Sequence, residues 1–226
     1  MNILMNMSSR LVIALGIAGC VITAGCDLSA GRMIGFGACI SGMLLQRMDY
    51  SGKFFPDMQP LNVFVVALIA MLVCAAFGTV TGFFIAYLNV PPFIATLAMM
   101  EIVYGIGLIV TNATPLGGYV EQYTNVSNGK FLGINYLIWI AIIVAAITWF
   151  IFNMTRHGKY MYAIGGNPQA AEVAGVPVKA TMILIYMKAA AMYGLAGFML
   201  GAKAGGASVN LGYGYEMEAI AACTIG

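Results

Sequence analysis

Residues 153–180, NMTRHGKYMYAIGGNPQAAEVAGVPVKA, form a long polar stretch late in a chain that is otherwise strongly apolar. Arg156, His157 and Lys159 directly follow one apolar run, and Lys179 precedes the next. Basic residues beside apolar runs are typical of loops on the cytoplasmic side of a membrane. This stretch therefore indicates a membrane protein and predicts that residues 153–180 face the cytoplasm.

The composition of the whole chain supports the same class of protein. Of its 226 residues, 62% are hydrophobic and only 8% are charged, whereas a soluble domain carries roughly 25% charged residues. The net charge of +2 comes from scattered side chains, which excludes the extended basic surface of a nucleic-acid-binding protein. With so little polar surface, the chain is expected to lie in a lipid bilayer.

The apolar runs predict an all-α, polytopic transmembrane helical bundle with about six spans and an incomplete last one. The expected spans are residues 10–26, 33–45, 61–87, 93–110, 134–152 and 181–202, and the incomplete one begins at residue 216. We expect residues 1–226 to form a single transmembrane domain that is truncated at both ends. Residues 153–180 would be the cytoplasmic loop within it.

The first two expected spans are short, and the charged stretch DLSAGR (residues 27–32) separates them. Asp27 and Ser29 are residue types that favour a helix N-cap, so the second helix could start at this point. Either two short spans meet at a tight turn, or one helix is broken at membrane depth. Irregular backbone at that depth needs protein or water around it.

A cytoplasmic position for residues 153–180 orients the other loops. It predicts that residues 46–60 and 111–133 lie on the outer side and that the turn at residues 89–92, NVPP, lies inside. The two prolines of that turn predict the end of one helix and the start of the next. Arg47 and Lys53 oppose this orientation, although Asp49 and Asp57 accompany them.

Four stretches, in this order, carry a resemblance to a known family. They are DLSAGR (27–32), GTVTGFFIAYLNVPPFIATLAM (78–99), YAIGGNPQAAEVAGV (162–176) and GYEMEAIAACTIG (214–226). Together they resemble the membrane-spanning permease subunits of bacterial ABC sugar importers of the ribose, galactoside and xylose type, and most closely the galactoside branch. The resemblance covers nearly the whole chain.

The resemblance implies a pathway for a monosaccharide, such as galactose or a methyl galactoside, across the bacterial inner membrane. It implies three protein partners: a separate ABC ATPase subunit, a periplasmic sugar-binding protein, and a second permease subunit in a homodimer. It also implies that the 162–176 loop couples the permease to the ATPase. The coupling residues would be Gly165, Gly166, Asn167 and Pro168 in a turn, followed by a coupling helix from Gln169 to Gly175 with Ala170, Ala171, Glu172 and Ala174.

The residues of this loop fit that role on physical grounds as well. Pro168 suits the first turn of a helix and Asn167 the cap before it, and two preceding glycines permit a positive φ. Ala170, Ala171 and Ala174 would leave a thin face that a groove can approach closely. No Walker A sequence is present in the chain, so ATP hydrolysis would belong to the separate subunit.

Polar residues inside the apolar runs suggest further sites. Asp27, Ser29 and Gly31 lie at the predicted break and are candidates for the translocation pathway. Glu101 and Lys188 lie within two expected spans, where isolated charges are unfavourable, so they could form an intramembrane ion pair. An alternative function, an ion-coupled secondary transporter, would use Asp27 and Glu101.

Nothing in the sequence predicts a metal ion, another cofactor or catalytic chemistry. His157 is the single histidine, and its neighbours are basic. The five cysteines lie in or beside apolar runs without a C-x-x-C spacing, which is typical of buried apolar side chains. An enzyme within the membrane would need clustered histidines or carboxylates. The sequence therefore predicts a transport subunit and not an enzyme.

Overall fold

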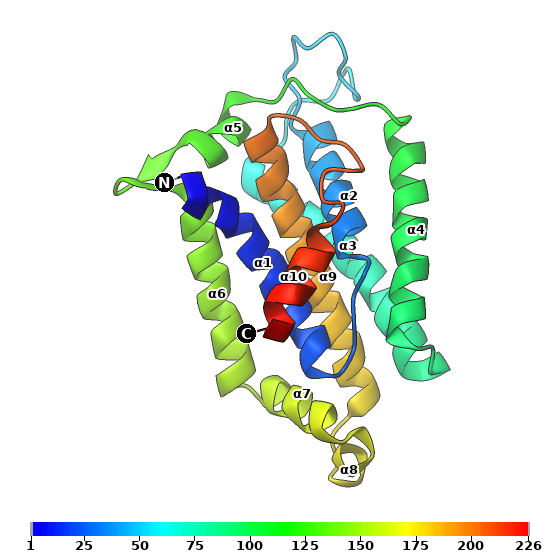
Figure 1. Ribbon diagram of the computed structural model, residues 1–226. Helices are drawn as coiled ribbons and strands as arrows, with labels where there is room; N and C mark the ends of the chain where they lie inside the picture. Colours follow the sequence, from blue (N-terminus) through cyan, green and yellow to red (C-terminus); the bar gives the residue numbers. More distant parts are fainter. Residues whose placement is uncertain (1, 226) are drawn as a thin grey trace.

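The computed structural model describes residues 2–225, and the chain is mainly helical (Figure 1). The elements are α1 (Asn2–Ile22), α2 (Ala30–Leu44), α3 (Val63–Leu88), α4 (Pro92–Thr111), α5 (Glu121–Asn128), β1 (Lys130–Phe131), β2 (Ile134–Asn135), α6 (Tyr136–Met154), α7 (Arg156–Gly166), α8 (Pro168–Val173), α9 (Val178–Ala204) and α10 (Tyr215–Ile225). β1 and β2 form a small antiparallel hairpin. The predicted all-α bundle is confirmed.

Five helices among the described residues are long and apolar enough to cross a membrane: α1, α3, α4, α6 and α9. Helix α2 has 15 residues, which makes it about 22 Å long. The hydrocarbon core of a bilayer is about 30 Å thick. The second of the six spans predicted from the sequence, residues 33–45, is therefore a shorter helix that does not cross the membrane alone.

The turn at residues 89–92 forms as predicted. Helix α3 ends at Leu88, and Asn89 follows in the left-handed conformation with φ of 52°. Pro92 is the first residue of α4. Asparagine adopts this conformation more readily than most residues, and proline is favoured at the first position of a helix. Local sequence therefore determines where these two helices end and begin.

Helix α9 is the centre of the bundle and packs against α1, α2 and α3 (Figure 1). Its contact with α3 is close: a Cβ atom on Gly78 would lie 2.4 Å from the carbonyl oxygen of Tyr186, and one on Gly82 would lie 2.7 Å from Cα of Ile183. Small residues let two helix backbones approach in this way. The G-x-x-x-G sequence at residues 78–82 is therefore a packing motif within the chain.

Between α1 and α2 the backbone turns and then runs back into the bundle as an irregular segment, residues 26–28 (Figure 1). Ala24 has φ of 55°, and the N–H of Gly25 donates to the carbonyl oxygen of Cys20 (2.9 Å). The Tyr193 hydroxyl, near the middle of α9, donates to Asp27 Oδ2 (3.0 Å). The break therefore lies at membrane depth and not in a loop at the cytoplasmic side.

The predicted N-cap of α2 forms differently from expectation. Ser29 is the N-cap residue, but its backbone is already helical and its side chain makes no capping hydrogen bond. The Ser29 hydroxyl instead donates to Asp27 Oδ1 (2.6 Å), and its backbone N–H donates to the same oxygen (3.0 Å). Asp27 is 2% exposed. Its carboxylate therefore holds the irregular segment 26–28 in place, because it accepts hydrogen bonds from Ser29 and from α9.

Helix α10 also begins inside the bundle, close to the start of α2 (Figure 1). Glu216, in its first turn, is buried, and its Oε2 accepts a hydrogen bond from the N–H of Gly214 (3.0 Å). A Cβ atom on Gly31 would lie 2.8 Å from the carbonyl oxygen of Gly212. The segment 205–214 therefore packs directly on the first turn of α2.

Residues 46–60 and 111–133 share one end of the bundle, and α7 and α8 lie at the opposite end (Figure 1). A backbone bridge joins Gln46 to Tyr119, and the Gln46 side-chain amide donates to the carbonyl oxygen of Gly117 (3.0 Å). The prediction that these two loops share a side is confirmed. We refer to their end as the outer end and to the α7–α8 end as the inner end.

Candidate functional site

Helix α7 leaves α6 through a tight junction at Thr155 and Gly158. The Thr155 hydroxyl oxygen accepts a hydrogen bond from the N–H of Gly158 (3.4 Å) and so caps α7. A Cβ atom on Gly158 would lie 1.9 Å from the carbonyl oxygen of Phe152. Only glycine therefore permits this junction, which fixes the direction of α7 relative to α6.

The other end of α7 rests on the inner end of α1. A Cβ atom on Gly165 would lie 2.0 Å from the carbonyl oxygen of Ile22. One turn earlier, the buried Met161 packs its terminal methyl group against Gly19. Helix α7 is therefore fixed to α6 at its start and to α1 along its length.

The turn predicted for residues 165–168 is wrong in its first half. Gly165 and Gly166 are the last residues of α7, and neither has a positive φ. Gly165 is required by its close approach to α1, whereas nothing lies within 4 Å of a Cβ atom on Gly166. The change of direction occurs at Asn167, whose φ is −159°.

Helix α8 has the predicted cap, but it begins one residue earlier and ends two residues earlier than predicted. The Asn167 side-chain oxygen accepts a hydrogen bond from the N–H of Ala170 (3.0 Å), and Pro168 is the first helical residue. Gly175 has φ of 85°, a conformation that terminates helices. Helix α8 therefore spans Pro168–Val173 and not the predicted range of residues 169–175.

The surface of α8 projects from the inner end of the bundle (Figure 1). Val173 is 91% exposed, and Gln169, Ala170, Glu172 and Ala174 are exposed around it. Val173 lies within the predicted coupling helix but is not among the coupling residues that the resemblance implies. The signal that could have found it is a lone β-branched apolar residue in a helix of otherwise small and polar residues. Burying such a side chain in a groove is worth about 1.5 to 3 kcal/mol.

Ala171 does not belong to this exposed surface, contrary to expectation. It is 5% exposed, and its carbonyl oxygen accepts a hydrogen bond from the N–H of Val176 (3.0 Å). Ala170 and Ala174 remain exposed. The surface available to a partner is therefore formed by Ala170, Val173 and Ala174, and Ala171 packs toward the chain itself.

Helix α8 is connected directly to the central helix α9, which begins at Val178. The Thr181 hydroxyl donates to the carbonyl oxygen of Pro177 (2.9 Å), and the Lys179 ammonium lies 5.1 Å from the centroid of the Tyr87 ring on α3. A displacement of α8 would therefore act on α9 through the chain and on α1 through α7.

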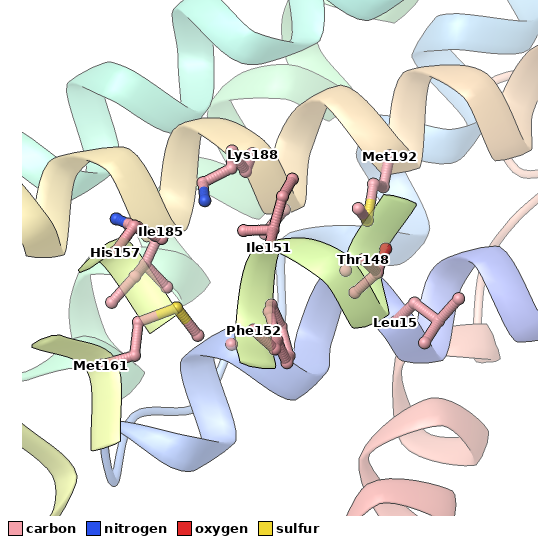
Figure 2. A pocket seen from close by; sticks show the side chains of 12 residues that line it. Leu15, Thr148, Ile151, Phe152, His157, Met161, Ile185, Lys188 and Met192 are labelled. Carbon is pink, nitrogen blue, oxygen red and sulfur yellow. The ribbon is translucent and has the colours of Figure 1, made fainter. Parts of the chain in front are cut away.

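A small pocket of about 20 Å³ lies above α7, between α1, α6 and α9 (Figure 2). This is space for about one water molecule. His157 and Lys188 both line it, and Nε2 of His157 is buried without a hydrogen-bond partner among the described residues. Burial and the positive charge of nearby Lys188 lower the pKa of His157 to about 4. His157 is therefore neutral at pH 7.

This pKa predicts a dependence of stability on pH. The unfolded His157 takes up a proton near pH 6.5, but the folded residue does so only near pH 4. Stability is therefore present above pH 6.5 and is lost as the pH falls toward 4. We expect the melting temperature to fall less between pH 7 and pH 5 in His157→Gln than in the wild type. Equal falls in both proteins would contradict the account.

The three candidate pathway residues are all buried in the chain. Asp27 is 2% exposed and Ser29 is fully buried. Gly31 packs against the carbonyl oxygen of Gly212. Asp27 and Ser29 stabilise the irregular backbone before α2 through hydrogen bonds. Gly31 allows residues 205–214 to pack closely on α2. These residues do not line an open channel in this chain.

Glu101 and Lys188 form no ion pair within the described residues, so the predicted pairing is wrong for the single chain. Glu101 is exposed on α4, and α4 packs against α2 and α3. Lys188 lies on α9 beside His157, in the pocket at the inner end. The two spans were assigned correctly, but the sequence did not show that these side chains point to different parts of the bundle.

No cluster of three or more histidine, cysteine or carboxylate side chains suitable for a metal ion occurs among the described residues. All five cysteines are free thiols, and Cys20, Cys39 and Cys74 are buried.

Comparison with known proteins identifies the family. The family described as "Branched-chain amino acid transport system / permease component" matches residues 1–226. The chain is 42% identical to the galactose/methyl galactoside import permease protein of Escherichia coli K12, over 100% of the chain and 69% of that protein. It is 43% identical, with the same coverage, to the protein of that name from Haemophilus influenzae. No solved structure matches the chain significantly.

A more distant relative is the ribose import permease protein of Escherichia coli K12, which is 31% identical over 100% of the chain and 68% of that protein. The family description and these names differ in the substrate, but all of them describe permease components. Such components work with an ATPase and a substrate-binding protein. The chain therefore belongs to this permease-component family, as a multi-pass transport subunit of the inner membrane and not an enzyme.

Proposed function

We propose that this chain forms the membrane pathway of an ATP-driven importer for a monosaccharide, galactose or a methyl galactoside or a similar sugar. The names of the relatives at 42% and 43% identity support the galactoside, and the ribose permease is less similar at 31%. In this proposal residues 1–226 act as one transmembrane domain. The sugar-binding protein docks at the outer end and the ATPase at the inner end.

We further propose that the α7–α8 segment couples ATP hydrolysis to the pathway. The observation that carries this proposal is the exposure of Val173, 91%, at the tip of a segment that glycine contacts fix to the bundle. A ligand shifts a conformational equilibrium only by binding the two states differently. Closure of the ATPase around Val173 would supply that difference and move α8 together with α9.

A second copy of the permease is also part of the proposal. Glu101 is exposed on a membrane-spanning helix, and a carboxylate that faces lipid is strongly unfavourable. In a homodimer this face of α4 would be covered by protein or would face water. No observation favours the ion-coupled alternative, because the carboxylate of Asp27 already accepts three hydrogen bonds and is 2% exposed.

The test is uptake of labelled galactose by the complete transporter in liposomes, with the ATPase and the binding protein present. Wild-type uptake should require ATP and should persist when ion gradients are dissipated. Val173→Asp places a charge at the position where we propose an apolar contact with the ATPase. We expect it to reduce ATP-dependent uptake about tenfold or more while the complex still inserts. Glu172→Gln, which changes the charge of an adjacent exposed residue, is the control and should retain most of the uptake.

Two results would contradict the proposal. Uptake that follows a proton or sodium gradient without ATP would favour the ion-coupled alternative. Full uptake by Val173→Asp, in a complex that transports normally otherwise, would show that α8 does not contact the ATPase through this residue.

A further inference from the structure

Arg32 lies between two tyrosine rings inside the bundle. It is in the first turn of α2, about 18 Å below the outer end of that helix at 1.5 Å per residue. Its guanidinium carbon lies 3.9 Å from the ring centroid of Tyr104 on α4 and 4.4 Å from that of Tyr213. Nη1 donates a hydrogen bond to the side-chain oxygen of Asn210. The segment 205–214 and two helices thus meet at one guanidinium.

The positive charge of Arg32 has no carboxylate within ion-pair distance in the described part of the chain. Its Nε is buried and has no hydrogen-bond partner there. A guanidinium has five N–H donors, and an arginine at membrane depth normally faces protein, a partner charge or a water-filled cavity. Two ring faces and one amide oxygen leave most of these donors unsatisfied. This face of the bundle must therefore be open to water or to a polar ligand.

The neighbouring side chains show which side of the bundle this is. Tyr213 is 61% exposed, and Asn210 is exposed beside it. Glu101, one turn before Tyr104 on α4, is exposed as well. A face that carries an arginine, a glutamate, an asparagine and two tyrosines is poorly suited to lipid. It is suited to contact with water or with a polar ligand.

We propose that Arg32, Tyr104, Asn210 and Tyr213 form a contact site for a neutral sugar near the middle of the pathway. An aromatic face can cover the C–H side of a sugar ring, while the free guanidinium donors and the Asn210 amide bond its hydroxyl groups. The identity of the ligand rests on the proposed function. A branched-chain amino acid is the competing ligand, because its carboxylate would pair with Arg32.

The first test measures access to the site. Tyr213→Cys is introduced into the complete transporter with the five native cysteines replaced, and a membrane-impermeant thiol reagent is added from outside. We expect labelling, slowed several-fold by galactose delivered by the binding protein and not by leucine. Ile143→Cys on α6, a position 54% exposed in this chain, is the control and should remain unlabelled in lipid.

The second test measures uptake by Arg32→Gln. Loss of charged hydrogen bonds to a sugar should raise KM for uptake about tenfold or more. Arg10→Gln removes an arginine that pairs with Glu218 on the surface (3.1 Å) and should leave KM unchanged. Absence of ATP-dependent galactose uptake in the wild type would refute the proposed function and not this site alone.

The site itself would be overturned by any of three results. They are an unlabelled Tyr213→Cys, labelling that leucine slows and galactose does not, or a wild-type KM in Arg32→Gln. If Arg32→Gln does not assemble, the labelling experiment with Tyr213→Cys decides, because that variant retains Arg32.

Discussion

Replacement of Gly165 by valine is expected to abolish uptake and to reduce the free energy of unfolding by at least about 3 kcal/mol. The reason is steric. A Cβ atom on Gly165 would lie 2.0 Å from the carbonyl oxygen of Ile22, and a backbone atom cannot move aside as a side chain does. Helix α7 would have to separate from α1, which breaks one of the two connections between α8 and the bundle.

Gly166→Val is the matched control for this prediction. Gly166 is the next residue in the same helix, and no atom lies within 4 Å of a Cβ atom built on it. The two variants share the same change of side chain and helix propensity, so their difference reports the contact with Ile22. Thermal unfolding in detergent and ATP-dependent uptake are the measurements. Equal behaviour of the two variants would contradict the close approach of α7 to α1.

Asp27→Ala is expected to reduce the free energy of unfolding by about 3 kcal/mol. It would leave the Ser29 N–H, the Ser29 hydroxyl and the Tyr193 hydroxyl without their acceptor at membrane depth, and each such loss is worth about 1 kcal/mol. Tyr193→Phe removes only one of the three hydrogen bonds and should reduce it by about 1 kcal/mol. The irregular segment 26–28 would then be held to α9 by packing alone.

The double variant completes this test. Because both single changes remove the same bond between Asp27 and Tyr193, the combined loss should be smaller than the sum of the two. Asp27→Asn retains the shape and can still bond Ser29 and Tyr193, so it should keep most of the uptake. If Asp27→Asn abolished uptake in a stable complex, the carboxylate charge itself would be required, as the ion-coupled alternative demands.

Local sequence predicts those parts of the structure that depend on local interactions. The apolar runs predicted the spans. Asn89 and the prolines that follow it predicted the boundary between α3 and α4. Asn167 and Pro168 gave the start of α8. In each case a few adjacent residues determine the backbone, because capping and the fixed φ of proline act within one turn.

Features that depend on distant contacts could not be predicted in this way. Gly165 and Gly166 are indistinguishable in the sequence, yet only Gly165 meets α1. In the sequence Arg32 is simply part of a charged turn, because its partners Tyr104 and Tyr213 lie far along the chain. The sequence predicts that the first span begins at residue 10, but α1 begins at Asn2, and Ser8 and Ser9 are buried in the bundle.

The surface of α8 shows the same limit at the candidate site. The sequence located the coupling helix to within two residues, but it could not show which face the bundle covers. Ala171 faces the chain and Val173 faces outward, because α8 is oriented by the glycine contacts of α7 and by its connection to α9. From residue type alone, the alanines were the expected contact surface for the ATPase.

The most direct test of the central claim is cross-linking between α8 and the ATPase in the assembled transporter. Val173→Cys and Ala171→Cys are compared with the native cysteines replaced, since the first position is 91% exposed and the second 5% exposed. Our account predicts that Val173→Cys cross-links to the ATPase subunit with a yield that changes when nucleotide binds, and that Ala171→Cys does not. No cross-link from Val173→Cys in a complex that imports sugar would contradict it.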